Sequence, residues 1–305
     1  MTTTPTPAPS LAKSESGALP TDGLIALLIL YVLWGSTYLG IKFALISFPP
    51  FLLGATRFPL AGLLMFIVLK VRGVPNPTPR QWLHCAIYGV FLIGGGNGIL
   101  AFAEQYLSSG LAAALLAVQP MVIALLAGLF GQWPTRLEWV GIAIGTIGVV
   151  LLNFDSQLSG NFIGVIALTV ALLCWAFGSV LARYKLDLPS GPMTTSIELT
   201  AGGLLQLTVS LVLQERMTAL DPRAAAGWVF LFIASIVGFT AYTTVLQKLR
   251  PALASSFSYV NPVVALALGA LIGGEHVSIY AVVGVAVIVA GVVFISLAQQ
   301  RKTSG

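Results

Sequence analysis

Four long apolar segments each carry their most unusual side chains near the midpoint of the segment: Trp34, Gln119-Pro120, Trp175 and Asn261-Pro262. An indole ring can pack against an apolar group or attract an ammonium group, and an amide can hydrogen-bond a polar one. At about 1.5 Å of rise per helical residue, these side chains lie at one depth. We therefore expect them to line one cavity that binds a small solute. The alternative is that the indoles pack a core and the amides hold helices together.

The two prolines add a second reason to expect a cavity at this depth. Proline has no N–H and blocks the helical bond to the carbonyl four residues earlier, here those of Leu116 and Ser258. In lipid, such freed backbone is tolerated only where protein or a wet cavity satisfies it. We expect Pro120 and Pro262 to be hinges beside the cavity, and simple kinks in packed helices are the alternative.

The run Gly94-Gly95-Gly96-Asn97-Gly98 is the least helix-favouring stretch inside any apolar segment. Each glycine costs about 1 kcal/mol relative to alanine in a helix interior, so the run needs a reason. It could bend the helix during gating or bring bare backbone to the substrate. It could also allow close helix packing through Gly94-x-x-x-Gly98. Asn97 at this depth favours a place beside the cavity.

Three tyrosines complete the expected site. Tyr38 follows Trp34 by one turn, Tyr259 is near Asn261, and the Tyr242 hydroxyl could donate to the substrate. The expected substrate-binding residues are Trp34, Tyr38, Asn97, Gln119, Trp175, Tyr242, Tyr259 and Asn261. The expected hinge residues are Gly94, Gly95, Gly96, Gly98, Pro120 and Pro262.

Two charged residues lie inside apolar segments rather than at their ends. Arg57 and Glu198 each lie about six residues inside, at equivalent positions of the two halves and toward opposite membrane faces. Intramembrane charges are costly and usually functional, so a gate role and burial against other polar groups both stay open. No Lys or Arg is expected at mid-depth, where a phosphorylated solute would need one, so the solute is expected to be neutral or zwitterionic. Glu198 is the only carboxylate clearly inside a segment, which favours gradient-driven movement over obligatory proton antiport.

The elements that position these residues are apolar helices in a membrane. The chain has 305 residues, of which 57% are hydrophobic and 8% charged, whereas soluble domains carry about 25% charged residues. A water-soluble protein is therefore excluded, and we predict an all-α integral membrane protein. The runs long enough to cross a bilayer are 23–45, 50–71, 81–103, 109–131, 135–153, 161–184, 192–215, 225–248, 252–274 and 277–298. They are too long for the strands of a β-barrel.

The basic residues predict the orientation of these ten runs. With the N-terminus in the cytoplasm, eleven Lys and Arg fall inside and four outside, as the positive-inside rule requires. Both termini are then cytoplasmic, in a multi-pass protein of the inner (plasma) membrane. Residues 1–22 are expected to be a disordered tail and 299–305 a short cytoplasmic tail.

The chain repeats itself at an offset of about 141 residues, which matches Trp34 to Trp175 and Gln119-Pro120 to Asn261-Pro262. The two units, 23–153 and 161–298, hold five runs each. Because five is odd, the second unit enters the membrane inverted relative to the first. Inverted-topology repeats are typical of secondary transporters.

The joint order of several motifs carries a family resemblance. Trp34-Gly35-Ser36, the prolines of the fourth and ninth runs, and Gly274-Glu275 resemble the EamA branch of the drug/metabolite transporter superfamily. The resemblance implies a solute exporter or exchanger, and bacterial amino-acid exporters belong to that branch. One departure is Gly131-Gln132, where the family often has Gly-Glu.

We predict a secondary transporter that exports small neutral or zwitterionic solutes, above all amino acids, by alternating access. Purines or cationic drugs are alternative solutes. An integral membrane enzyme is a weaker alternative, because the sequence shows no clustered His or carboxylates and no hydrolase or nucleotide-binding motif. We expect no cofactor, no metal and no nucleic-acid partner, and a functional monomer in the lipid bilayer. Cys85 and Cys174 lie in separate apolar runs and predict neither a disulfide nor a metal site.

Overall fold

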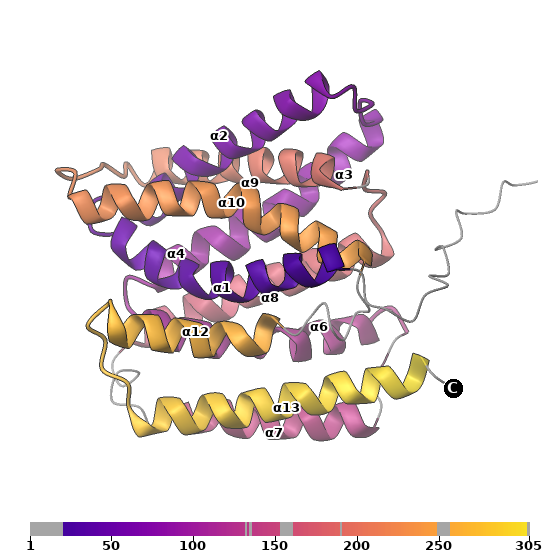
Figure 1. Cartoon of the computed structure of the whole chain (residues 1–305), viewed down its shortest axis with the longest axis vertical. Coiled ribbons are helices and arrows are strands. Elements are labelled where there is room, and N and C mark those ends of the chain that lie inside the picture. The colour runs from indigo at the N-terminus through magenta and orange to yellow at the C-terminus, as the bar shows by residue number, and fades with distance from the viewer. Residues whose placement is uncertain are drawn as a thin grey trace, which may run out of the picture.

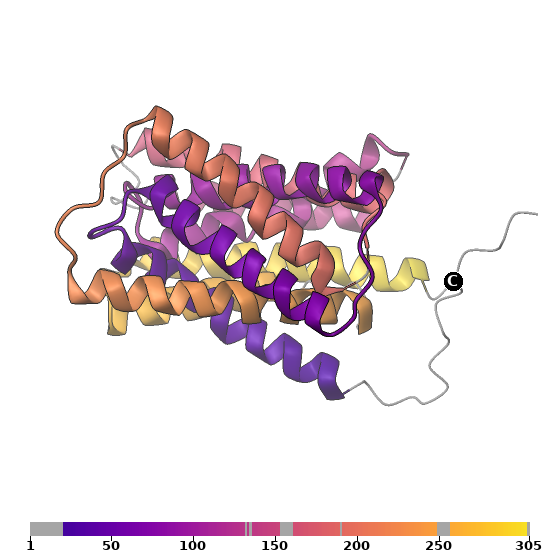
Figure 2. The ribbon, with the colours of Figure 1, turned by 90° about the horizontal axis from the view of Figure 1, so that it is seen from above.

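The computed structural model describes residues 21–131, 133, 136–152, 161–189, 191–248 and 257–303, and these residues form a helical bundle without strands (Figure 1). The α-helices are α1 (Thr21–Ala44), α2 (Pro50–Val71), α3 (Pro79–Gly89), α4 (Gly98–Ala103), α5 (Ser109–Leu116), α6 (Gln119–Gly128), α7 (Arg136–Leu152), α8 (Phe162–Tyr184), α9 (Pro192–Val212), α10 (Pro222–Lys248), α12 (Phe257–Leu271) and α13 (Ile279–Thr303). A π-helix, η1 (Val90–Asn97), joins α3 to α4. The helix axes are roughly aligned with one another, and several helices are tilted from the common direction (Figure 2).

Seven described stretches are long and apolar enough to cross a membrane: Thr21–Ala44, Pro50–Val71, Pro79–Ala103, Ser109–Gly128, Phe162–Tyr184, Pro192–Val212 and Pro222–Tyr242. Three shorter apolar helices, Trp139–Gly148, Val260–Leu271 and Ile279–Gly291, occupy the other predicted runs. Large apolar side chains such as Val71 and Leu173 point outward from the bundle, as lipid-facing residues do. The all-α membrane class is confirmed, and the ten-span inverted repeat stays a prediction.

The helices begin at residues that suit a first turn. Pro50, Pro79, Pro192 and Pro222 each stand at the first helical position, where the missing N–H costs no hydrogen bond. Ahead of α3, the Thr78 hydroxyl accepts from the Gln81 N–H, and the Gln81 side chain accepts from the Thr78 N–H. This reciprocal capping fixes where the helix starts.

Two helix pairs form opposite edges of the bundle (Figure 1). At one edge α2 packs on α9, and at the other α7 packs on α13. In the second pair, a Cβ added at Gly291 would lie 2.6 Å from the backbone nitrogen of Gly145. The two helix backbones therefore approach each other directly, which only a glycine allows at that point.

Between these edges, α1 and α8 lie at the centre of the contact network. The α1 helix contacts α10 and α12, while α8 contacts η1, α4 and α6. The α5 helix contacts α12. The four segments that carry the predicted mid-depth residues are therefore neighbours.

Two predicted runs are interrupted, and helix reaches into both expected tails. The run 81–103 is not one α-helix, because its glycine-rich middle adopts the π-helix η1. The run 109–131 is broken at Ala117 and Val118, directly before Gln119-Pro120. Helix also extends into both expected tails, since α1 begins at Thr21 and α13 continues to Thr303. Residues 1–20 and 304–305 lie outside the described residues.

A buried glutamine from a neighbouring helix supports the π-helix. Gln206 of α9 donates from Nε2 to the Ile93 carbonyl at 2.7 Å, and its side chain is fully buried. A Cβ at Gly54 or Gly98 would come within 1.6 Å or 3.1 Å of this side chain. Two glycines on separate helices thus make the space in which Gln206 lies.

Candidate functional site

Six of the eight predicted substrate-binding residues line one cavity inside the bundle: Trp34, Tyr38, Asn97, Gln119, Trp175 and Asn261. The cavity has a volume of about 80 Å³, which is room for several water molecules. Helices from both halves of the chain form its walls, with α1 and α5 from the first half and α8, α10 and α12 from the second. Four positions chosen from separate sequence segments therefore do lie together in space.

Aromatic rings form one side of the cavity. Trp34 and Trp175 meet edge to face, with ring centroids 6.2 Å apart and planes at 85°. Phe239 and Phe257 pack on Trp34 at 5.6 Å and 5.0 Å and also line the cavity. Tyr242 lies 5.0 Å from the Trp34 ring but is not among the residues that line the cavity, and its contact with substrate stays a prediction. It supports the indole from behind.

The glycine run makes room for side chains of the neighbouring helices. A Cβ at Gly96 would lie 2.9 Å from Cε3 of Trp175, and one at Gly95 would lie 2.9 Å from the Cys174 sulfur. Gly94 and Gly98 face Leu205 and Gln206 of α9. Close packing thus accounts for all four glycines, and Gly96 in particular lets the Trp175 indole reach the cavity wall. Their hinge role stays a prediction.

The two proline segments contribute matching parts of the wall. Leu116 and Ser258, each four residues before its proline, line the cavity together with the adjacent amides Gln119 and Asn261. Pro120 lies in the first turn of α6, directly after the helix break, whereas Pro262 lies inside α12. Helix irregularity therefore coincides with the cavity in both halves, as freed backbone in a membrane requires. Whether the prolines move as hinges stays a prediction.

Asn261 presents an unused acceptor. Its side chain is only 6% exposed, and its Oδ1 atom has no hydrogen-bond partner among the described residues. A buried amide oxygen without a partner is costly. It is therefore available to a donor on a bound molecule. The side chain of the last predicted residue, Tyr259, lies outside the described part of the structure.

Arg57 also lines the cavity, which sequence reasoning missed. The expectation that no basic residue lies at mid-depth is wrong. Position along the helix placed Arg57 near one membrane face, but α2 crosses the bundle obliquely (Figure 1) and brings Arg57 beside Asn97 of η1. The Nη2 atom donates to Asn97 Oδ1 at 3.4 Å, and Cζ lies 4.1 Å from the Phe58 ring centroid. The sequence signal that could have placed Arg57 at the cavity was its position inside an apolar run.

One carboxylate ties three helices together at the end of the bundle where α1 finishes. Glu275, after α12, pairs with Lys42 of α1 at 3.0 Å. It also accepts hydrogen bonds from the Ser109 N–H at 3.0 Å, the Ser109 hydroxyl at 2.8 Å and the Gly110 N–H at 3.4 Å, at the start of α5. Burial alone would raise the pKa of Glu275, but the bonds from Ser109 and Lys42 outweigh it and hold the pKa below its ordinary value. We call this cluster of Lys42, Ser109, Gly110 and Glu275 the latch.

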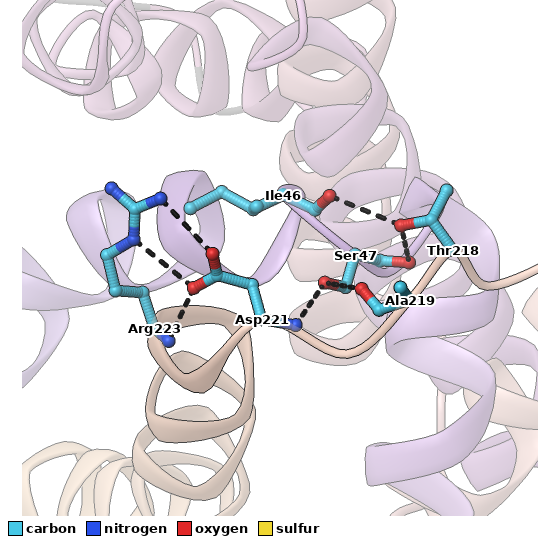
Figure 3. Close-up of polar contacts among 6 residues, drawn as sticks. All are labelled: Ile46, Ser47, Thr218, Ala219, Asp221 and Arg223. Atoms are coloured by element: carbon cyan, nitrogen blue, oxygen red, sulfur yellow. Dashed lines mark hydrogen bonds and ion pairs between the residues drawn. The ribbon is translucent and has the colours of Figure 1, made fainter.

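A second contact joins the halves at the same end (Figure 3). The Ser47 hydroxyl, between α1 and α2, donates to the Ala219 carbonyl at 2.9 Å and accepts from the Asp221 N–H at 2.9 Å. The Thr218 N–H donates to the Ser47 carbonyl at 3.1 Å. Asp221 in turn accepts from Arg223, whose side-chain hydrogen bond lowers the pKa of this carboxyl.

Two buried carboxylates lie outside the cavity. Glu104, just after α4, is 3% exposed, and neither of its carboxylate oxygens has a hydrogen-bond partner among the described residues. It lies at a helix end, and neighbouring helices cover it. Glu198 is 2% exposed, and its Oε2 atom has no partner within the described residues. The part of the chain that the structure describes holds no cluster of three or more His, Cys, Asp and Glu side chains suited to a metal ion.

The family of EamA-like transporters matches residues 21–154 and 162–297. The chain belongs to this family. Together with its apolar helices, that makes the protein a multi-pass membrane transporter and confirms the resemblance in the sequence.

Relatives of this EamA transporter cover nearly its whole length. The "Uncharacterized inner membrane transporter YedA" of Escherichia coli K12 is 40% identical over 285 residues, 92% of each chain. The "Probable amino-acid metabolite efflux pump" of Salmonella typhimurium LT2 is 27% identical and covers 88% of this chain and 93% of its own. A crystal structure of a protein 22% identical in sequence superposes with a TM-score of 0.67 over 94% of this chain and all of that one. It shows that the fold is shared.

Proposed function

We propose that this EamA transporter is a secondary carrier that exports small zwitterionic solutes, above all amino acids, across the inner membrane. The observation that carries the proposal is a shared cavity to which both halves contribute an indole and an amide, with an acceptor at Asn261 that has no partner among the described residues. Indole faces suit an apolar side chain or an ammonium group, and the Asn261 oxygen suits an ammonium donor. Arg57 in the same wall disfavours purely cationic drugs.

The helix contacts support an inverted repeat of two five-helix units as the basis of this carrier. The equivalent of α1 in the second half is α8, and the equivalent of α10 in the first half is the stretch formed by α3, η1 and α4. Exchanging each helix for its equivalent therefore turns the contact of α1 with α10 into the contact of α8 with η1 and α4, and both contacts are present. The same exchange turns α1–α12 into α8–α6 and returns α2–α9 and α7–α13 to themselves. Contacts that match under this exchange fit two units related by a pseudo-twofold axis.

In the proposed cycle, the cavity opens alternately to the two sides of the membrane. The latch closes the end where Lys42 lies. This conformation is therefore either closed at both ends or open at the opposite end alone. With the N-terminus in the cytoplasm, the latch faces outward and would open to release solute. The two halves of the chain both contribute to the cavity, and the proposed working unit is a monomer.

Uptake and counterflow in proteoliposomes test the function. The purified full-length chain is reconstituted and offered labelled amino acids, purine bases and cationic dyes in parallel. We expect saturable exchange for amino acids with apolar side chains and none for cationic dyes. Exchange of purines or dyes without exchange of any amino acid would contradict the proposal.

A further inference from the structure

Arg57 is a buried cation whose hydrogen-bonding capacity is only partly used. Its side chain is 4% exposed, and its Nε atom has no hydrogen-bond partner among the described residues. The Nη2 bond to Asn97 is long, at 3.4 Å, and its acceptor is a neutral amide. A charge in the membrane interior is expensive unless a partner compensates it. Arg57 therefore needs an anion that this conformation does not place in direct contact.

Glu104 is the protein's own carboxyl group near Arg57, and it leaves the guanidinium open. It attracts Arg57 through space, but the two form no ion pair within 4.0 Å in the described structure. Both Glu104 oxygens also lack hydrogen bonds to described residues, and Glu104 does not line the cavity. Glu104 therefore leaves the hydrogen-bond donors of Arg57 unoccupied.

We propose that Arg57 binds the carboxylate group of the transported solute, with Asn97 orienting the guanidinium, an assignment that rests on the function proposed above. Among the described residues that line the cavity, Arg57 is the one charged side chain. A guanidinium binds a carboxylate through two parallel hydrogen bonds, which gives orientation as well as affinity. The rest of the solute then lies toward the indoles of Trp34 and Trp175.

The anion is a carboxylate rather than a phosphate. A phosphoryl group carries nearly two charges at neutral pH, and the described wall offers one arginine and no lysine to meet them. A single carboxylate matches the single cation. The amide of Asn261, with its free oxygen, adds an acceptor that suits the ammonium group of a zwitterion.

Binding of matched acid and amide probes to the detergent-purified full-length protein tests this assignment. The probes are L-phenylalanine with L-phenylalaninamide, and 3-phenylpropionate with 3-phenylpropionamide, titrated calorimetrically so that passive leakage across lipid plays no part. We expect the wild type to bind each acid about tenfold or more tightly than its amide, because a charge-assisted pair is lost in the amide. Arg57→Gln should bring this ratio to about one.

Two further variants make the comparison specific. Arg216→Gln removes the same charge from an exposed position outside the cavity and should keep the wild-type ratio. Arg57→Lys keeps the charge but loses the planar fork, so its ratio should fall several-fold. The ratio is measured within one protein preparation and is insensitive to the folded fraction. If Arg57→Gln does not fold, Arg57→Lys is the deciding variant. An acid-to-amide affinity ratio in Arg57→Lys equal to that of the wild type then overturns the assignment.

The outcomes separate this assignment from the proposed function. Binding of phenylalanine with no preference over its amide, or a preference that survives Arg57→Gln, overturns the role of Arg57 and leaves amino-acid transport standing. Arg57-dependent binding of 3-phenylpropionate without binding of phenylalanine supports the carboxylate site and contradicts amino-acid transport. Binding of none of the four probes overturns both.

Discussion

At the scale of single residues, Trp34 and Trp175 occupy equivalent positions in the two halves and form a shared wall of the cavity. Their rings meet at 6.2 Å, so each indole holds the other in place. Trp34 is further fixed by the packing of Phe239, Tyr242 and Phe257 around it. A solute that enters the cavity therefore meets a rigid aromatic surface rather than mobile side chains.

We predict that Trp34→Ala and Trp175→Ala each weaken transport. Losing an aromatic contact of about 0.5–1.5 kcal/mol should raise the half-saturation concentration about two- to tenfold. Initial rates of amino-acid exchange in proteoliposomes measure this effect. Trp139→Ala is the control, because Trp139 is 47% exposed on α7 and away from the cavity. Unchanged kinetics in both cavity variants would show that these indoles only pack the core.

A second prediction concerns the support of the π-helix. Gln206→Leu removes the donor to the Ile93 carbonyl and leaves that buried acceptor without its partner. We expect a loss of about 1 kcal/mol in stability, as for other interhelical hydrogen bonds in membranes, and a lower thermal unfolding midpoint in detergent. Thr208→Val is the control, because Thr208 is exposed on the same helix and bonds only to its own backbone at Leu204. Equal midpoints for the two variants would contradict a structural role for Gln206.

Sequence reasoning worked for residues whose type is unusual for their depth, and failed where depth itself was misjudged. Trp34, Gln119, Trp175 and Asn261 were found from their types and the internal repeat. Arg57 was placed too close to a membrane face, and the burial of Glu104 was not foreseen. In both cases the neighbouring helices, whose tilt and packing the sequence does not state, decide the environment.

At the scale of helices, the latch joins α1, α5 and the end of α12 through the Glu275 carboxylate. Lys42 and Ser109 belong to the first half of the chain and Glu275 to the second. Opening this end by moving one half against the other would break all of these contacts together. The latch is therefore expected to set the balance between the closed and open states of this end.

We predict that Glu275→Gln shifts this balance toward the open state. The neutral amide loses the ion pair with Lys42, and its NH2 group cannot accept from Ser109. A cysteine at Ser235, which lines the cavity, should then react several-fold faster with an impermeant thiol reagent added on the latch side. Cys85 and Cys174 are replaced by alanine beforehand. The same cysteine in a protein that retains Glu275 is the reference, and equal rates would contradict the latch.

The latch also has a defined pH dependence. The latched state holds the pKa of Glu275 below its ordinary value of 4.5. Its contribution is therefore fully present above that value and is lost as the pH falls through the lowered pKa. At each pH, the labelling rate of Ser235→Cys in the protein with Glu275 is divided by the rate of the same cysteine in Glu275→Gln, which cancels the titration of the thiol itself. This ratio should stay constant between about pH 6 and 8 and approach one only below about pH 4.

Helix existence followed directly from the apolar runs, but helix continuity did not. The break before Gln119-Pro120 was signalled by the proline. The π-helix at Val90–Asn97 was not predicted, because a glycine-rich run lowers helix stability without specifying which irregular form the backbone adopts. The side chains of Leu205, Cys174, Trp175 and Gln206 on the neighbouring helices occupy the space that these glycines leave.

At the scale of the whole molecule, the energy source is the open question with the clearest test. Glu104 and Glu198 are buried carboxylates with unpartnered oxygens, and such groups carry protons in many transporters. Neither lines the cavity, so in this conformation neither shares a site with the solute. We therefore keep the expectation of gradient-driven movement.

Proteoliposomes with equal pH on both sides should equilibrate substrate down its gradient, and an imposed pH gradient should not drive accumulation beyond that point. Glu104→Gln and Glu198→Gln should leave the equilibrium distribution unchanged. Uphill accumulation under a pH gradient that disappears in either variant would identify that carboxylate as the proton site and refute the expectation.

The latch is chemically one-sided. Its carboxylate follows Gly274, whereas the equivalent position in the first half holds Gln132 after Gly131. A charged clamp at one mouth and an uncharged residue at the equivalent position of the other half make the two mouths unequal in a molecule that otherwise repeats itself. We therefore expect a carrier built this way to rest with the clamped mouth shut. An inhibitor too bulky to be transported would then reach the cavity only from the opposite face of the membrane. The same compound applied to the clamped face would have no effect.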